Sequence, residues 1–409
     1  TLQIPAATRT PVNIHMAYSN DPTEMVLRFR TTDSGTPMAQ YGTDKDTGRD
    51  SRIVKGNSHT FGPNDMCGEP ANITQVGCFQ KPGMLHVVRL TQLKPNTTYY
   101  YRVGLSYGQG VQYSAVFNFS SAPPLGSRDS FQYIVYGDQG CPSVGWGDGG
   151  LWTSAMASRE SKARAVHHFG DLAYAMGAAH IWEEWLHMIE PFSRYIPLMV
   201  GVGNHEYDHL VGGANGKDPS GVTSDAGFHP MWGNMGNDSG GECGVPTSQH
   251  FTMPQSNNSN GVFWYSHDFA TVHTIMLSTE HNMTNGSPQY LFLQQDLKQI
   301  NRTITPWLVI EMHRPMYESE FFWSQNTVGL GERQEIEDLL LQYKVDLVLA
   351  GHYHAYLRTC DGLYRSKCDQ GGPTHITVGS AGAILDKALL YPQEWTKKFV
   401  PLKYGYGRI

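Results

Sequence analysis

No stretch of this sequence is apolar for long enough to cross a membrane, because its longest apolar runs have the length of a strand, far below the roughly 20 residues that a spanning helix needs. No cluster of Lys and Arg occurs and the formal net charge is −7, which argues against a nucleic-acid or anionic-membrane surface. No internal repeat is present. Charged residues make up only 16% against 40% hydrophobic residues, a globular balance. The 409 residues are more than one typical domain needs and fewer than three need.

The amino terminus also lacks an apolar signal region, and we interpret Thr1 as the start of a mature chain whose signal peptide has been removed. An even number of cysteines and a high number of Asn-x-Ser/Thr sites support a secretory route. The cysteines are Cys67, Cys78, Cys141, Cys243, Cys360 and Cys368. The candidate glycosylation sites are Asn72, Asn96, Asn118, Asn237, Asn257, Asn282, Asn285 and Asn301. We therefore expect a protein that is secreted or lies in the lumen of the endomembrane system or vacuole.

The cysteines are expected to form disulfides, because no Cys-x-x-Cys pair occurs that would favour a metal site. Six cysteines can pair in many ways. Close spacing favours Cys67–Cys78 and Cys360–Cys368, which leaves Cys141–Cys243.

The first part of the chain has the pattern of an all-β domain. Residues 25–30 alternate apolar and polar side chains, as a half-buried strand does. Residues 93–103 place Leu, Pro, Thr, Tyr and Val at the offsets of the tyrosine corner of fibronectin type III-like sandwiches, and an ordinary Tyr-rich hairpin is the alternative. Residues 121–126, rich in Pro and small residues, indicate a linker.

After the linker, strand-like runs alternate with helical stretches, the pattern of an α/β layered domain. The runs cover residues 133–136, 165–169, 196–202, 307–310 and 345–350. Helices are expected over residues 179–189, 290–300 and 332–344. The Gly/Asn-rich residues 212–260 are expected to form a long loop at the rim of the active site.

Each of these strand-like runs is followed by side chains that can bind a metal ion. They are Asp138, Asp171, Tyr174, Asn204, His313, His352 and His354. Because ligands of open α/β sheets gather at the carboxyl ends of strands, we expect these side chains to meet. Glycines precede four of them and suit tight turns.

Seven ligands exceed what one zinc or iron ion takes, but they fill two sites if one carboxylate bridges. Two metal ions about 3.5–4 Å apart form a recognised clamp for phosphoryl transfer. A single Gly-Asp motif needs no function, because it is an ordinary turn at the end of a strand. Five motifs with metal-binding side chains in this order are not explained by turn formation alone. The sequence therefore predicts a two-metal phosphoesterase.

The ordered motifs Gly-Asp, Gly-Asp-x-x-Tyr, Gly-Asn-His, His and Gly-His-x-His resemble the calcineurin-like metallophosphoesterases, and the offset of Tyr174 narrows the resemblance to the purple acid phosphatases. Residues 239–246 and 313–317 match the larger members of that family. The implied fold is an N-terminal all-β fibronectin type III-like sandwich over residues 1–122, followed by an α/β metallophosphoesterase domain over residues 128–409, a β-sandwich flanked by helices.

The resemblance implies a secreted acid phosphatase with a dinuclear Fe(III)–M(II) centre, in which a metal-bound hydroxide attacks phosphorus and the optimum pH is acidic. The ferric ion would be held by Asp138, Asp171, Tyr174 and His354. The divalent ion, which is zinc, manganese or ferrous iron, would be held by Asp171, Asn204, His313 and His352. His205 would orient phosphate or protonate the leaving oxygen, or would only hydrogen-bond a ligand.

Candidate substrate contacts extend beyond Asn204 and His205. Where many members carry a His pair, residues 318–323 read Glu-Ser-Glu-Phe-Phe-Trp, whose rings could stack on a nucleobase or simply pack a loop. His281 lies in a segment that resembles members acting on nucleotides and phosphodiesters. Arg314 could bind phosphate as a bidentate donor or pair with a carboxylate.

We expect small phosphorylated substrates, nucleotides among them, with a homodimer as the candidate assembly. Two alternatives remain open at this point. One is a nucleotide pyrophosphatase/phosphodiesterase of the same family. The other is a catalytically inert secreted binding protein.

Overall fold

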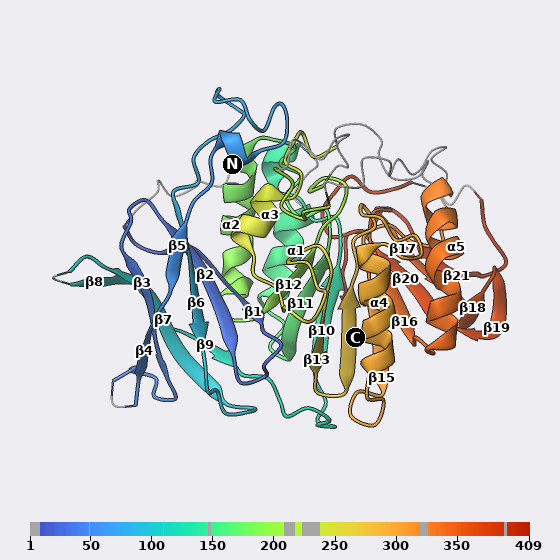
Figure 1. The fold of residues 1–409 in the computed structure, drawn as a ribbon, viewed down its shortest axis with the longest axis horizontal. Helices are drawn as coiled ribbons and strands as arrows, with labels where there is room; N and C mark the ends of the chain where they lie inside the picture. Colours follow the sequence, from blue (N-terminus) through green and yellow to red (C-terminus); the bar gives the residue numbers. More distant parts are fainter. Residues whose placement is uncertain are drawn as a thin grey trace.

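The computed structural model describes residues 9–48, 50–108, 110–145, 149–207, 217–222, 238–319, 326–387 and 391–409. The chain forms an N-terminal β-sandwich that lies beside a larger layered domain (Figure 1). This architecture is the one expected from the sequence, although the division at residues 122 and 128 stays a prediction.

Two antiparallel sheets make up the N-terminal sandwich. The strand order is β1-β2-β6-β5 in one sheet and β4-β3-β7-β8 in the other, where β9 also pairs with β7. The strands are β1 (Val12–Tyr18), β2 (Met25–Thr31), β3 (Thr36–Gly42), β4 (Arg52–Lys55), β5 (Asn57–His59), β6 (Met84–Leu90), β7 (Thr98–Ser106), β8 (Val111–Tyr113) and β9 (Phe117–Ser120).

The tyrosine corner is formed by Tyr99, at the start of β7. Its hydroxyl accepts a hydrogen bond from the backbone N–H of Lys94 over 2.9 Å. The ring packs between Tyr41 and Phe119. The alternative of an ordinary hairpin is therefore not needed.

The expectation that residues 25–30 form a half-buried strand was wrong in one respect, because β2 is buried on both faces. Its polar side chains do not face water. The guanidinium of Arg30 pairs with Glu183 of the neighbouring domain at 2.9 Å, and Arg28 donates to Thr252 at 2.9 Å. The alternating pattern therefore marks an interdomain face rather than a solvent face.

Two facing sheets form the core of the second domain. One has the order β12-β11-β10-β22 and the other β13-β14-β15-β16-β20-β17-β21, with a small β18-β19 pair beside them. The bounds are β10 (Gln132–Tyr136), β11 (Ala163–Phe169), β12 (Leu198–Gly201), β13 (Tyr265–Phe269), β14 (Val272–Met276), β15 (Trp307–Glu311), β16 (Leu347–Ala350), β17 (Tyr356–Thr359), β18 (Gly362–Tyr364), β19 (Lys367–Gly372), β20 (Thr374–Val378), β21 (Thr396–Val400) and β22 (Gly407–Arg408).

Helices flank these sheets, with α2 against the N-terminal sandwich and α4 and α5 beside the larger sheet (Figure 1). The bounds are α1 (Gly149–Ala157), α2 (Ala179–Ser193), α3 (Val245–His250), α4 (Pro288–Gln299) and α5 (Asn326–Gln342). The three expected helices are present as α2, α4 and α5, and α5 starts six residues before the expected residue 332. Helix α1 was not predicted, and α3 corrects the view of residues 212–260 as loop alone.

Local chemistry explains where two of these helices form. Ser287 caps α4 by accepting the N–H of Tyr290, and Pro288 follows at the first helical position. Ile181, Trp185 and Met188 make α2 apolar on one face, and all three are buried.

The disulfide pairing expected from spacing was wrong for two of three pairs. The structure joins Cys67 to Cys243 and Cys360 to Cys368, while Cys78 and Cys141 carry free thiols. Close spacing along the chain identified only the pair 360–368. The bond from Cys67 crosses between the two domains, which no local pattern reveals.

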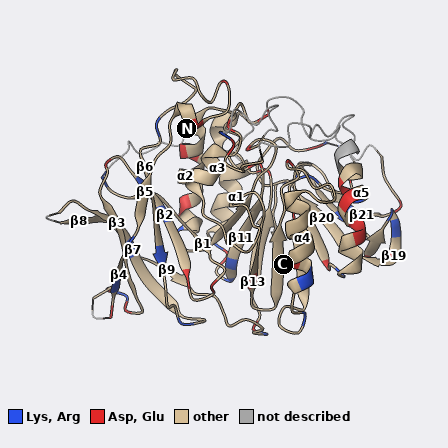
Figure 2. Ribbon diagram, viewed as in Figure 1, with Lys and Arg blue, Asp and Glu red and all other residues tan. Residues whose placement is uncertain are grey.

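Among the described residues, no helix combines the length and apolarity that crossing a membrane requires. Lys and Arg are spread over many elements, whereas acidic residues gather along α2 and α5 (Figure 2).

Candidate metal centre

The predicted ligands come from the carboxyl ends of strands in both sheets of the second domain. Asp138, Asp171 and Asn204 follow β10, β11 and β12 of one sheet. His313 and His352 follow β15 and β16 of the other. The parallel pairing of these strands within each sheet brings their ends together, as the sequence led us to expect.

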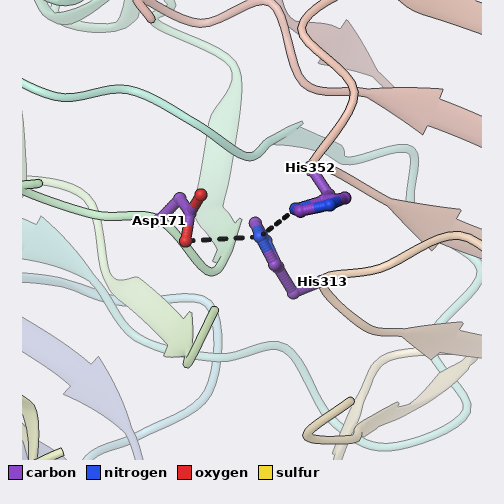
Figure 3. Close-up of side chains that lie close together, drawn as sticks. All are labelled: Asp171, His313 and His352. Carbon is purple, nitrogen blue, oxygen red and sulfur yellow. Dashed lines mark hydrogen bonds and ion pairs between the residues drawn. The ribbon is translucent and has the colours of Figure 1, made fainter. Parts of the chain in front are cut away.

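The first group of ligands consists of Asp171, His313 and His352 (Figure 3). Nε2 of His313 lies 3.2 Å from Oδ1 of Asp171 and 3.2 Å from Nδ1 of His352. Oδ1 of Asn204 lies 3.1 Å from the same Nε2. One carboxylate, one amide oxygen and two imidazoles therefore converge on one point.

The second group consists of Asp138, Asp171 and His354. Nε2 of His354 lies 3.3 Å from Oδ1 of Asp138 and 3.1 Å from the hydroxyl of Tyr174. Asp171 belongs to both groups. Among the described residues these are the two clusters of His, Cys, Asp or Glu with the spacing of a metal site, and they share a carboxylate.

Backbone carbonyls fix which ring nitrogen of two histidines faces the centre. Nδ1 of His313 lies 3.1 Å from the carbonyl of Phe169, and Nδ1 of His354 lies 2.6 Å from the carbonyl of Ile384. A carbonyl only accepts, so both Nδ1 atoms carry the hydrogen and both Nε2 atoms face the carboxylates. Metal-binding histidines are oriented in this way.

The electrostatics of the centre favour positive charge. Burial opposes protonation of His313 and His354, but Asp171 and Asp138 raise the pKa of each to about 9. Burial would raise the pKa of Asp171, yet His313 and His205 hold it well below its usual range. Carboxylates that attract protons onto neighbouring imidazoles would equally attract metal cations.

The turns that carry the ligands have an unusual backbone. Asp138, Asp171, Tyr174 and His352 have φ values of 64°, 54°, 55° and 69°, in the left-handed region. The glycines before the ligands serve mainly close packing. A Cβ at Gly203 would overlap the carboxylate of Asp171 and the ring of His313.

Glu206 supports the turns of the predicted ligands, and sequence reasoning missed it. Its fully buried carboxylate accepts the backbone N–H groups of Asp171, Leu172 and Gly203 over 2.7, 2.7 and 3.0 Å. It therefore fixes two of the ligand turns. Its place beside His205 in Gly-Asn-His-Glu was the available signal.

His205 lies at the open side of the centre. Its side chain is 21% exposed, against 2% for Asp171, and its Nε2 lies 4.0 Å from Oδ2 of Asp171. Nδ1 lies 3.1 Å from the carbonyl of Asp238 and therefore carries the hydrogen. This arrangement turns Nε2 toward the place where a substrate would meet the ligands.

The other two candidate substrate contacts are buried. Both carboxylate oxygens of Glu280 accept from the guanidinium of Arg314, at 2.7 and 3.1 Å, which is the carboxylate pairing left open by the sequence. His281 stacks on Tyr207 with ring centroids 4.0 Å apart. Residues 320–323, with the aromatic side chains Phe321 to Trp323, lie outside the described residues. The assignment of Arg314 and His281 to substrate stays a prediction.

Comparisons with known proteins agree with this geometry. Residues 11–121 match the family model of the purple acid phosphatase N-terminal domain, and residues 152–356 match that of the calcineurin-like phosphoesterases. The chain is similar to the purple acid phosphatase PPD1 of yellow lupin (Lupinus luteus) seeds, with a TM-score of 0.85 and 27% identity over 98% of this chain and 70% of that one.

Two curated relatives carry different names. A probable inactive purple acid phosphatase 9 of Arabidopsis thaliana is 31% identical over 98% of this chain and 64% of its own length. A nucleotide pyrophosphatase/phosphodiesterase of Hordeum vulgare is 31% identical over 64% of this chain and 69% of its own length. The chain spans less than two thirds of the length of the first curated relatives it matches.

Proposed function

Because this chain belongs to the purple acid phosphatase family of metallophosphoesterases, we propose that it hydrolyses phosphate esters at a centre of two metal ions. The observation that carries the proposal is the position of Asp171, which is shared by two groups of ligand atoms from separate strands. A carboxylate that two ligand groups share can bridge two metal ions held close together, whereas a single-metal site has no use for a second group of ligands.

The residues present fit such a centre. Tyr174 supplies a phenol oxygen beside Asp138, Asp171 and His354, a set that suits a hard ferric ion. Asn204, His313 and His352 complete a second set around Asp171, which suits zinc, manganese or ferrous iron. When bound, the two ions would supply charge neutralisation and activation of water for attack on phosphorus.

The protein's own residues then hold and protonate the substrate. The buried ligands form one wall, and the half-buried His205 and His354 mark the open side from which a phosphate ester would approach. With Nδ1 bound to the Asp238 carbonyl, Nε2 of His205 is the atom that would give a proton to the leaving oxygen.

The test combines metal analysis with activity on p-nitrophenyl phosphate. Wild-type protein should hold two ions and turn over the ester. Asp171→Asn should lose both properties, whereas His205→Gln should keep both ions and lose about 10²–10⁴-fold in kcat. A wild-type protein that takes up two ions yet fails to cleave any ester would favour the inert binding protein, as the name of the first Arabidopsis relative suggests.

Nucleotides are the second candidate class of substrate. The barley relative is named a nucleotide pyrophosphatase/phosphodiesterase, and the expected aromatic residues 321–323 would suit a nucleobase. Assays of p-nitrophenyl phosphate, its bis-ester and ATP side by side decide the matter. Turnover of the simple monoester alone would refute the hypothesis that nucleotides are substrates.

A location on the secretory route is part of the proposal. Of the eight candidate glycosylation sites, those at Asn96, Asn118, Asn257, Asn285 and Asn301 are exposed. Asn72 and Asn282 are half-buried, and Asn237 lies outside the described residues. Glycan release by an endoglycosidase, followed by mass spectrometry of protein from its native source, tests this location. The homodimer stays a prediction that sedimentation would check.

A further inference from the structure

Asp238 contacts two neighbouring residues of the metal centre at once. Its Oδ2 accepts a hydrogen bond from Nδ2 of Asn204 over 3.1 Å. Its backbone carbonyl lies 3.1 Å from Nδ1 of His205. The carboxylate of Asp238 therefore binds the amide of Asn204, while its carbonyl separately binds the half-buried His205.

The carboxylate decides which way the Asn204 amide faces. An ionised carboxylate only accepts hydrogen bonds, so the NH₂ group of Asn204 must face Asp238. The amide oxygen then faces the opposite side, where it lies 3.1 Å from Nε2 of His313. Because oxygen is the only atom of this amide that binds a cation, the flipped amide would present hydrogens to the centre and could not be a ligand.

Asp238 is itself held by the segment that follows it, residues 238–244. The carbonyls of Gly240 and Gly241 accept backbone N–H groups of Ala71 and Cys67 over 3.0 Å each. The disulfide from Cys243 to Cys67 closes the same contact. On its other side the N–H of Gly244 donates to the carbonyl of Glu206 over 2.7 Å.

We propose that Asp238 is a positioning residue that orients the Asn204 amide oxygen toward the metal ion bound by His313 and His352. The inference rests on the proposed function, because it assigns Asn204 as a ligand. It also assigns one role to the Asp238 side chain, which contacts Asn204, and another to its backbone carbonyl, which contacts His205. Removal of the side chain should affect metal binding through Asn204 and leave the backbone contact to His205 in place.

Four variants, which are Asp238→Ala, Asp238→Asn, Asn204→Ala and the double variant, test this assignment in protein stripped of ions with a chelator and titrated with Zn²⁺ alone in a calorimeter. Asp238→Ala should weaken binding of one of two ions by about 10–100-fold and leave the other unchanged. Asp238→Asn removes the charge but keeps an acceptor, so it should stay closer to wild type. In the Asn204→Ala background, Asp238→Ala should cause no further loss.

Activity on p-nitrophenyl phosphate gives a second readout. Excess Zn²⁺ should restore the activity of Asp238→Ala, which a misfolded variant could not regain. Equal binding of two ions by wild type and Asp238→Ala, or independent losses from Asp238 and Asn204, would overturn the inference and leave the proposed function standing. A folded wild-type protein that binds no ion would instead overturn the proposed function, and this inference with it.

Discussion

Glu206 lies directly behind Asp171 and accepts its backbone N–H over 2.7 Å. The same carboxylate accepts the N–H of Gly203, in the turn that carries Asn204. The carboxylate shared by the two candidate ligand groups and the turn that carries Asn204 therefore depend on the same buried side chain.

Replacement of Glu206 by Gln should loosen these turns, because the new NH₂ group faces backbone donors. A buried N–H without an acceptor costs about 1–3 kcal/mol, so the free energy of unfolding in urea should fall by that amount. Metal ions should also bind more weakly. Glu394→Gln, at an exposed position, is the matched control. Unchanged stability in Glu206→Gln would show that these backbone hydrogen bonds do not stabilise the two turns.

His273 should make the free energy of unfolding depend on pH. It lies between Asp268 and Asp296, at 2.6 and 2.7 Å, and although burial opposes its charge, these carboxylates raise the pKa of His273 from 6.5 to about 9. A raised folded-state pKa gives stability that is complete below pH 6.5 and lost as the pH rises through 9, about 3 kcal/mol in total.

Urea unfolding of the wild type and His273→Gln at pH 6.5 and 9.5 measures the contribution of His273 to the free energy of unfolding. The difference between the two proteins should shrink as the pH rises. Parallel stability curves would show that His273 is not the group responsible.

Arg314 is expected to act in stability rather than in substrate binding. Arg314→Ala would leave Glu280 buried without its partner, at a cost of about 3–5 kcal/mol in the free energy of unfolding. The double variant Arg314→Met with Glu280→Leu should recover most of that loss. If Arg314 instead contacts phosphate, the single variant would raise KM and leave unfolding unchanged.

Tyr174 should give the iron-loaded protein its colour, because a phenolate bound to ferric ion absorbs visible light. Burial raises the pKa of the Tyr174 hydroxyl well above its usual range, so only a strong cation would ionise it. Tyr174→Phe should lose the visible band while iron content, measured separately, is retained. A band that survives the substitution would remove Tyr174 from the ligand set.

Peptide mapping without reduction should recover Cys67 linked to Cys243 and Cys360 linked to Cys368. Cys78 is half-buried and should react with an alkylating reagent in the native state, whereas the buried Cys141 should react only after unfolding. Because the bond at Cys67 closes a loop of 176 residues, Cys67→Ser should lower stability by about 2–5 kcal/mol. A linked peptide of Cys67 and Cys78 would contradict the structure.

The ligands could be anticipated from sequence because each is local to a strand end. Gly-Asp and Gly-His place a short polar turn after a buried strand, and parallel pairing then brings the turns together. The fold class followed from the same alternation of strands and helices.

Long-range partners could not be anticipated in this way. The alternating sequence of β2 suggests that its polar face meets solvent. In the structure, this face instead packs on the second domain, where Arg30 pairs with Glu183 of α2. The acceptor role of Glu206 depends on backbone N–H groups, which carry no sequence signal of their own. Likewise, the bond between Cys67 and Cys243 joins two domains, and no local pattern near either cysteine indicates its partner.

The candidate metal centre carries backbone strain, because four of its turn residues have left-handed φ values. They are Asp138, Asp171, Tyr174 and His352. Such a conformation costs a residue with a side chain about 1–2 kcal/mol, and glycine escapes that cost. The carboxylates of Asp138 and Asp171 offset part of that cost, because they accept the backbone N–H groups of His352 and His205. The candidate metal centre is therefore a place where backbone strain and side-chain hydrogen bonds balance one another.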